Sequence, residues 1–275
     1  AVRLQLFSRE YVRRFSDDLN ILFLSQQQQQ QYSKRYQWDA MAYRAHVGSL
    51  IPSKWDILLG TRNIENARQE FSRKGAVLLK NILSPLECEF LSKYFADAIR
   101  RGYPESVADY DSGLVRSIFN SDRVSFLWLT ELNDLMTRIV GRPVKKAYSF
   151  LCGYKTQQHN RRPWLLGHTD REDNEFTFSI TLTHDGPKSP PFPIYAHKKR
   201  MVSRRKNYAF PGFDQVLEFV NDIGDALIFK GRQHIHFRND MDPKLDTYWT
   251  ILFHYVPLEF DFVDFKQRQE HNSDL

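Results

Sequence analysis

The chain has 275 residues, and its 39 Lys and Arg outnumber its 33 Asp and Glu to give a formal net charge of +6. With 41% hydrophobic and 14% aromatic residues, it can bury one sizeable core, so we expect one domain with terminal extensions. No run of about 18 apolar residues occurs, which excludes a membrane-spanning helix from our expectations. The basic residues are spread along the chain, which favours small anionic ligands as partners over nucleic acid.

Cysteine usage indicates the compartment. Cys88 and Cys152 are the only two cysteines, too few for a disulfide framework or a Cys-rich zinc site, so we expect an intracellular, cytoplasmic protein. The sequence starts at Ala1 rather than Met, which also fits a removed targeting segment. Any metal site must therefore be built from His and carboxylate side chains.

The composition divides the chain into two parts. Residues 1–60 contain a Gln run at 26–31 between aromatic, mixed-charge stretches, which predicts a helical, low-complexity N-terminal extension without chemistry. Residues 61–275 are expected to form the folded domain.

The first elements of this domain are predicted to be helical. A helical pattern near Ile64 leads into a short strand at 75–79. Residues 84–87, Ser-Pro-Leu-Glu, combine an N-cap hydroxyl, a proline at the first helical position and a glutamate that can reach back, which predicts a capping box. That helix should end before Gly102, and a second amphipathic helix is predicted at 124–140.

From residue 146 onward the pattern favours strands. Residues 176–183 alternate apolar and polar side chains, which predicts a half-buried antiparallel strand. Further strands are predicted at 147–154, 226–230, 234–238 and 248–256. Helices followed by strands indicate an α+β fold whose β part is a sandwich or barrel.

One short segment suggests chemistry. His168 and Asp170 are two residues apart, a spacing that directs both side chains the same way. Alone, such a pair also occurs by chance on polar loops. A third ligand is available from His234 or His236, and two His with one carboxylate form a facial triad that binds iron(II) and leaves positions open.

At this point the sequence resembles the non-haem Fe(II)/2-oxoglutarate-dependent dioxygenase superfamily, over about residues 70–260. The resemblance rests on the order and spacing of several motifs. These are Tyr148-Ser149-Phe150, Tyr154, His168-Thr169-Asp170-Arg171-Glu172, the alternating strand, Pro193-Ile194-Tyr195, Gly224-Asp225-Ala226-Leu227-Ile228-Phe229 and His236-Phe237-Arg238.

The resemblance implies a double-stranded β-helix, a cupin-like jelly roll, supported by the N-terminal helices. It implies Fe(II), 2-oxoglutarate and O2 as cofactor and co-substrates, with His168, Asp170 and His236 as metal ligands. His236 is preferred because its distance from Gly231 and the aromatic and Arg after it match the family's distal histidine. His234 is the alternative, since both lie on the same face of the predicted strand.

The distal carboxylate of 2-oxoglutarate needs a cationic partner, which in this superfamily is an Arg or Lys after the distal His. The resemblance points to Arg238, helped by the hydroxyl of Tyr154. Many relatives carry the basic residue about ten positions after the distal His, where this chain has Asp246 and Thr247. Lys244 is therefore a competitor of Arg238.

The implied reaction is oxidation of an unactivated C–H bond of a small, carboxylate-bearing substrate, with release of succinate and CO2. Hydroxylation, desaturation and oxidative cyclisation, as in the kainoid synthases, all fit. Halogenation does not, because the halogenating relatives lack the carboxylate that Asp170 supplies. Candidate anchors for an acidic substrate are the basic clusters 197–200 and 204–206 and the arginines Arg116, Arg161 and Arg162.

Three other functions remain open on the sequence. A protein or peptide hydroxylase of the same superfamily would use the basic loops to bind an acidic polypeptide. A non-catalytic β-sandwich binding module would have the triad histidines as buried polar residues. A zinc hydrolase would use the same ligands, with Glu172 as its general base.

Overall fold

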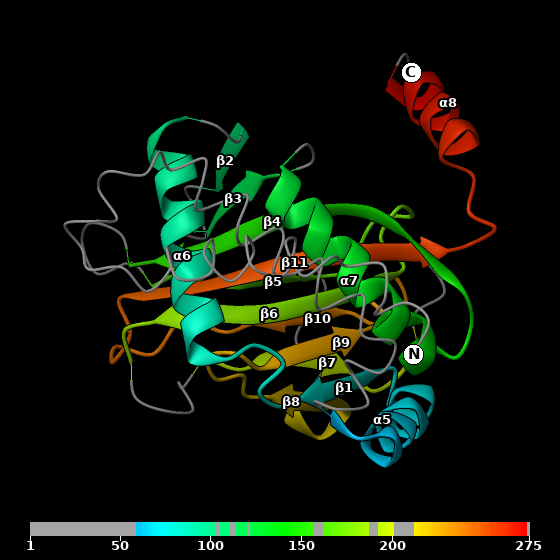
Figure 1. Cartoon of the computed structure of the whole chain (residues 1–275), viewed down its shortest axis with the longest axis horizontal. Coiled ribbons are helices and arrows are strands. Elements are labelled where there is room, and N and C mark those ends of the chain that lie inside the picture. Colours follow the sequence, from blue (N-terminus) through cyan, green and yellow to red (C-terminus); the bar gives the residue numbers. More distant parts are fainter. Residues whose placement is uncertain are drawn as a thin grey trace, which may run out of the picture.

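The computed structural model describes residues 59–102, 105–109, 114–119, 122–156, 162–186, 192–200 and 212–273. The expected N-terminal extension, apart from its last two residues, lies outside the described residues, as do Arg161 and the basic cluster 204–206. Figure 1 shows helices packed against layered strands, with the C-terminal helix extending away from them.

The elements carry the labels of Figure 1. In chain order they are α5 (Thr61–Lys74), β1 (Ala76–Leu79), α6 (Pro85–Arg100), β2 (Glu105–Asp109), β3 (Leu114–Ile118), α7 (Arg123–Val140), β4 (Val144–Lys155), β5 (Leu165–His168), β6 (Phe176–His184), β7 (Ile194–His197), the 3-10 turn Phe213–Gln215, β8 (Val216–Phe219), β9 (Ala226–Phe229), β10 (His236–Arg238), β11 (Thr247–Pro257) and α8 (Phe262–Ser273).

The strands form two antiparallel sheets. One has the order β1-β9-β6-β11-β4-β3-β2, and the other has the order β5-β10-β7-β8. Helices in the first half and antiparallel strands in the second agree with the predicted α+β class. The longest pairing joins β11 to β4 and β6, which places β11 in the middle of the larger sheet.

Local sequence signals set the helix ends. The predicted capping box is confirmed, because the Ser84 hydroxyl accepts a hydrogen bond from the Glu87 amide at 3.3 Å and the Glu87 carboxylate accepts one from the Ser84 amide at 2.8 Å. Helix α7 ends at Gly141, which has a φ of 80°, a left-handed conformation that glycine adopts without strain.

Helices α6 and α7 lie over one face of the larger sheet (Figure 1). Their apolar residues join those of β6 and β11 in one continuous core, which includes Leu91, Phe95, Leu132, Phe178 and Phe253. Within the described part of the chain, no helix combines the length and the apolar character needed to cross a bilayer.

Strand β6 differs from its prediction. Both sets of its alternating side chains are buried from Phe176 to Leu182, so the half-buried assignment is wrong. Phe178 packs in the core shared with the helices. The polar set, which includes Thr177 and Thr181, is also buried and hydrogen-bonded. The alternating pattern of β6 therefore marks two buried faces, one apolar and one polar, and not a buried face and an exposed one.

Several short elements were not predicted. Strands β2, β3, β7 and β8 have four or five residues each, too few for a periodic pattern to stand out. Their extended conformation depends on pairing with partners distant in sequence, such as β3 with β4. Helix α8 was also missed.

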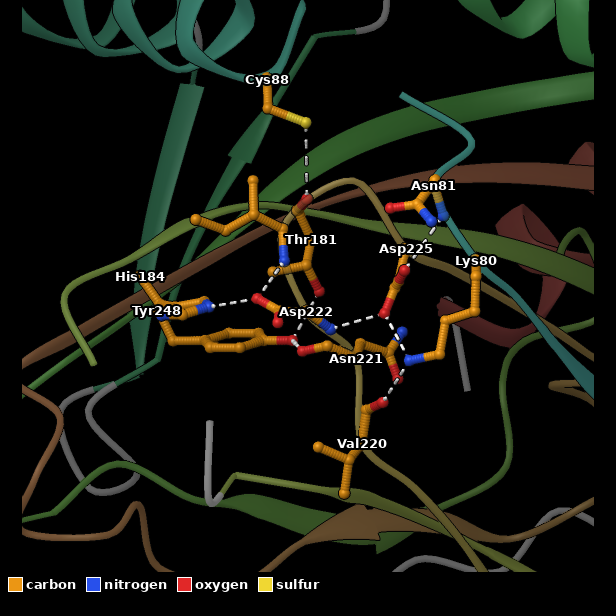
Figure 2. Close-up of polar contacts among 11 residues, drawn as sticks. Lys80, Asn81, Cys88, Thr181, His184, Val220, Asn221, Asp222, Asp225 and Tyr248 are labelled. Atoms are coloured by element: carbon orange, nitrogen blue, oxygen red, sulfur yellow. Dashed lines mark hydrogen bonds and ion pairs between the residues drawn. The ribbon is translucent and has the colours of Figure 1, made fainter. Parts of the chain in front are cut away.

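A polar network joins the turn before β9 to the end of β1 (Figure 2). Asp225 accepts hydrogen bonds from Lys80 Nζ at 2.7 Å and from the Asn81 amide at 3.1 Å. Beside it, Asp222 lies 3.1 Å from His184 Nε2, and the His184 ring stacks on Tyr248 with an interplanar angle of 7°. These contacts fix the position of Tyr248.

Candidate metal centre

The three predicted metal ligands come together where β5 and β10 pair. His168 ends β5 and lies directly opposite His236, the first residue of β10. Asp170 follows two residues later, and its Oδ1 is 3.6 Å from His168 Nε2 and 3.5 Å from His236 Nε2. One ligand atom from each residue lies within 4.8 Å of the others, which suits a facial set of three ligands.

Backbone carbonyls orient both imidazoles. His168 Nδ1 lies 2.7 Å from the Leu166 carbonyl, and His236 Nδ1 lies 3.1 Å from the His234 carbonyl. A carbonyl only accepts hydrogen bonds, so each Nδ1 must carry the proton. Each Nε2 is then left with a free lone pair beside Asp170, the arrangement that holds histidine as a metal ligand.

The protonation states also suit a cation. Burial, followed by the neighbouring His236, lowers the pKa of His168 to about 4, so this ring is neutral near pH 7. For Asp170 burial acts to raise the pKa, but His236 and His168 outweigh burial and the pKa lies below its usual value. The site therefore presents one carboxylate and a neutral imidazole.

A second layer of side chains holds Asp170. The Thr177 hydroxyl donates a hydrogen bond to Asp170 Oδ2 at 3.1 Å and also lies 3.1 Å from Asn174 Oδ1. His254 Nδ1 donates to the same Asn174 oxygen at 2.5 Å. Contacts of this kind fix the orientation of a ligating carboxylate.

Gly231 makes room for the carboxylate. Its carbonyl accepts a hydrogen bond from the Asp170 amide at 2.9 Å, and a Cβ at this position would lie 1.8 Å from Asp170 Oδ2. In the sequence, Gly231 serves only to mark the spacing to His236, and this contact is not predicted from it. The available signal was a glycine five residues before the distal histidine.

Arg238 lies close to the triad in a buried aromatic cage. Its guanidinium donates a hydrogen bond to the Phe192 carbonyl and lies 5.4 Å from the ring centre of Tyr154, 4.7 Å from that of Phe192 and 4.9 Å from that of Tyr248. Among the described residues no carboxylate pairs with it. A buried cation without a counter-charge is costly, so this cage is suited to binding an anion.

The competing residues lie elsewhere. Lys244 is exposed in the turn between β10 and β11. His234 precedes β10, with its Nδ1 2.8 Å from the His197 carbonyl and its Nε2 against Gly75. The expectation that His234 shares a strand face with His236 is wrong, because the strand begins only at His236.

The other basic and acidic candidates have separate contacts. Arg162 donates hydrogen bonds to the Thr156 hydroxyl and the Leu245 carbonyl, both at 3.1 Å, so it ties two loops together. Glu172, the proposed base of a zinc hydrolase, pairs with Arg268 of α8 at 2.9 Å. Arg116 lies on β3 opposite Cys152.

No protein-family model matches this sequence, and no curated protein matches it. Solved structures do. The epimerase SnoN in complex with Fe3+, alpha ketoglutarate and nogalamycin RO is 14% identical, with a TM-score of 0.56 over 70% of this chain and 83% of that chain. The alpha ketoglutarate dependent carbocyclase SnoK from nogalamycin biosynthesis has the same identity, TM-score and coverage.

A prolyl hydroxylase from Trichoplax adhaerens, in complex with a peptide fragment of hypoxia inducible factor, is 12% identical, with a TM-score of 0.54 over 73% of this chain and 92% of that chain. The resemblance of the sequence to the Fe(II)/2-oxoglutarate-dependent oxygenases is thereby confirmed as a shared fold.

Proposed function

We propose that this protein is a non-haem Fe(II)- and 2-oxoglutarate-dependent oxygenase, with His168, Asp170 and His236 as its metal ligands. The observation that supports this best is the combination of the triad with the buried Arg238. The triad would supply two nitrogen atoms and one oxygen atom to a cation, and these three atoms lie within 4.8 Å of one another. Arg238, with Tyr154 beside it, supplies a separate anion site for the distal carboxylate of 2-oxoglutarate.

The strand order supports the jelly-roll architecture that the resemblance implies. Of the strands from β4 to β11, four lie in the larger sheet in the order β9-β6-β11-β4, and four form the smaller sheet in the order β5-β10-β7-β8. A chain that passes repeatedly between two facing antiparallel sheets is what a double-stranded β-helix requires. We propose that β4–β11 form this core.

Iron and 2-oxoglutarate, when bound, supply the activation of dioxygen and the electrons released as 2-oxoglutarate is converted to succinate and CO2. The protein's own groups bind and orient. Asp170 and the two imidazoles would hold the metal, and the guanidinium of Arg238 would bind and orient the distal carboxylate of 2-oxoglutarate. Since Asp170 is present as the carboxylate ligand, we propose C–H hydroxylation, desaturation or cyclisation and not halogenation.

The proposed substrate is a small anionic molecule. The solved structures of similar fold include SnoN with the small molecule nogalamycin RO bound. A peptide hydroxylase is the second candidate, and the likeness to the Trichoplax adhaerens prolyl hydroxylase with its bound peptide supports it.

The test is an anaerobic Fe(II) titration with and without 2-oxoglutarate, read as the visible metal-to-ligand charge-transfer band of the chelate. We expect the band only when both are added, and its loss in His236→Ala.

Arg238→Met should raise the Kd for 2-oxoglutarate about 10- to 100-fold, because a charged hydrogen bond is lost. Lys244→Met, which changes an exposed cation, is the matched control and should leave that Kd unchanged.

A folded wild-type protein without the band would contradict the oxygenase function. An unchanged Kd in Arg238→Met together with a raised Kd in Lys244→Met would keep the oxygenase but reassign the 2-oxoglutarate site.

A further inference from the structure

A second arginine faces the same interior as Arg238 but comes from a different strand. Arg116 lies on β3, where it pairs with Cys152 of β4, and Leu114 pairs with Tyr154. Residues two apart on a strand share a face. Leu114, Cys152 and Tyr154 belong to one buried cluster, so Arg116 is on the face of the larger sheet that contributes to this cluster.

Arg116 and Arg238 have Cys152 as a common neighbour. Burial raises the pKa of the Cys152 thiol to about 12, and the charge of Arg116, which lies opposite Cys152 in the register of β3 and β4, opposes that shift. Arg238 also acts on Cys152. The two arginines therefore act on the same residue from different sheets, Arg116 from β3 of the larger sheet and Arg238 from β10 of the smaller one.

Arg116 has no carboxylate partner among the described residues. It is partly buried, whereas Arg238 is 4% exposed and enclosed by three aromatic rings. This difference in burial suits two ligands that bind one after the other. The co-substrate would fill the deeper site at Arg238, and the shallower site at Arg116 would stay accessible to the substrate.

The surface next to Arg116 is apolar and aromatic. Ile118, two residues further along β3, pairs with Phe150 of β4. The Phe150 ring stacks with Tyr148 at 6.1 Å, and both rings contact His254. This aromatic ladder extends from Cys152 toward the group that supports Asp170.

We propose that Arg116 binds a carboxylate of the substrate, and that the substrate is an organic acid whose apolar body lies over Phe150 and Tyr148. This inference rests on the proposed function and deepens it. Arg116 is then a specificity-determining residue, distinct from the co-substrate residue Arg238. The substrate's acid group is held at one end of the aromatic ladder while its C–H bonds lie toward the triad.

The experiment uses the anaerobic protein with Fe(II) and saturating 2-oxoglutarate. The probes are straight-chain monocarboxylates from butanoate to decanoate and their matching primary amides. Binding next to the metal is read as a change in the charge-transfer band. In the wild type we expect acids to change the band and amides of the same length to leave it unchanged.

In Arg116→Met we expect the affinity for the acids to fall about 10- to 100-fold, with the Kd for 2-oxoglutarate unchanged. Arg116→Lys keeps the charge and should retain part of the affinity for the acids. A lower affinity for 2-oxoglutarate in Arg116→Met would overturn the inference, because Arg116 would then belong to the co-substrate site.

The inference is also overturned if acids and amides act equally or if no acid changes the band. Absence of the band in the wild type, before any probe is added, is a separate result. It would overturn the oxygenase function and, with it, the role of Arg116.

Discussion

The two faces of the seven-stranded sheet are both buried but have opposite character. Toward the helices, β6 presents Phe178 and Ile180, and β11 presents Phe253, all 1% exposed or less. Toward the interior, β6 presents Thr177 and Thr181 instead, also 1% exposed or less. One strand therefore contributes to the apolar core with one set of residues and to the metal site with the other.

The difference teaches how a polar interior can be buried. Buried hydroxyls need hydrogen-bond partners, and here they find them across strands: Ser179 with Thr250 at 2.9 Å and Thr181 with Tyr248 at 2.6 Å. Each bond also restricts a rotamer. The hydroxyls of this face are therefore satisfied and held in place, which is the support that a preorganised site requires.

The largest expected effect is on the apolar face. Phe178→Ala removes a fully buried ring from the core and should lower the free energy of unfolding by about 3–5 kcal/mol, measured by urea denaturation. The folded fraction should still form the charge-transfer band with the wild-type affinity, because Phe178 points away from the triad.

Phe178→Leu, which keeps most of the volume, is the control in case the alanine variant does not fold. A loss of metal affinity in either variant, at equal folded fraction, would show that the two faces are not separable.

The next effect concerns acid stability and the interior face. Burial lowers the pKa of His254 to about 4, against about 6.5 when unfolded. The unfolded state therefore binds more protons between these values. The free energy of unfolding is therefore at its full value above about pH 6.5. It decreases as the pH falls from there through the folded pKa, and near pH 4 it is lower by about 3 kcal/mol.

His254→Gln removes the titrating ring while keeping a group that can donate a hydrogen bond to Asn174. Unfolding free energies measured from neutral pH down to pH 4 should fall less steeply in this variant than in the wild type. Parallel curves would mean that His254 is not the group responsible.

The smallest expected effect is on iron(II) affinity, and it distinguishes the hydroxyl that holds Asp170 from the other hydroxyls of the polar face. Thr177→Val keeps the shape of the side chain but removes the hydrogen bond to Asp170, and should lower iron(II) affinity about 10- to 100-fold. Thr250→Val removes a hydroxyl from the same interior that does not contact a ligand, and its iron affinity should equal that of the wild type. Equal losses in the two variants would argue against a specific role for Thr177.

Sequence reasoning succeeded where the signal was local. The capping box at Ser84, the end of α7 at Gly141 and the long strands β4, β6 and β11 follow from spacing and turn chemistry within a few residues. The prediction for the polar face of β6 was wrong, because an alternating pattern shows that a strand has two different faces but does not show whether solvent or protein covers each of them.

The site shows the same division. The sequence by itself determined that His168 and Asp170 share a direction and that Arg238 follows a histidine by two residues. Only the tertiary structure decided that His236 and not His234 lies opposite His168, that Gly231 leaves space for the Asp170 carboxylate, and that Arg116 lies opposite Cys152. The physical reason is that these contacts join strands separated by tens of residues, and their register depends on pairing and burial across the whole domain.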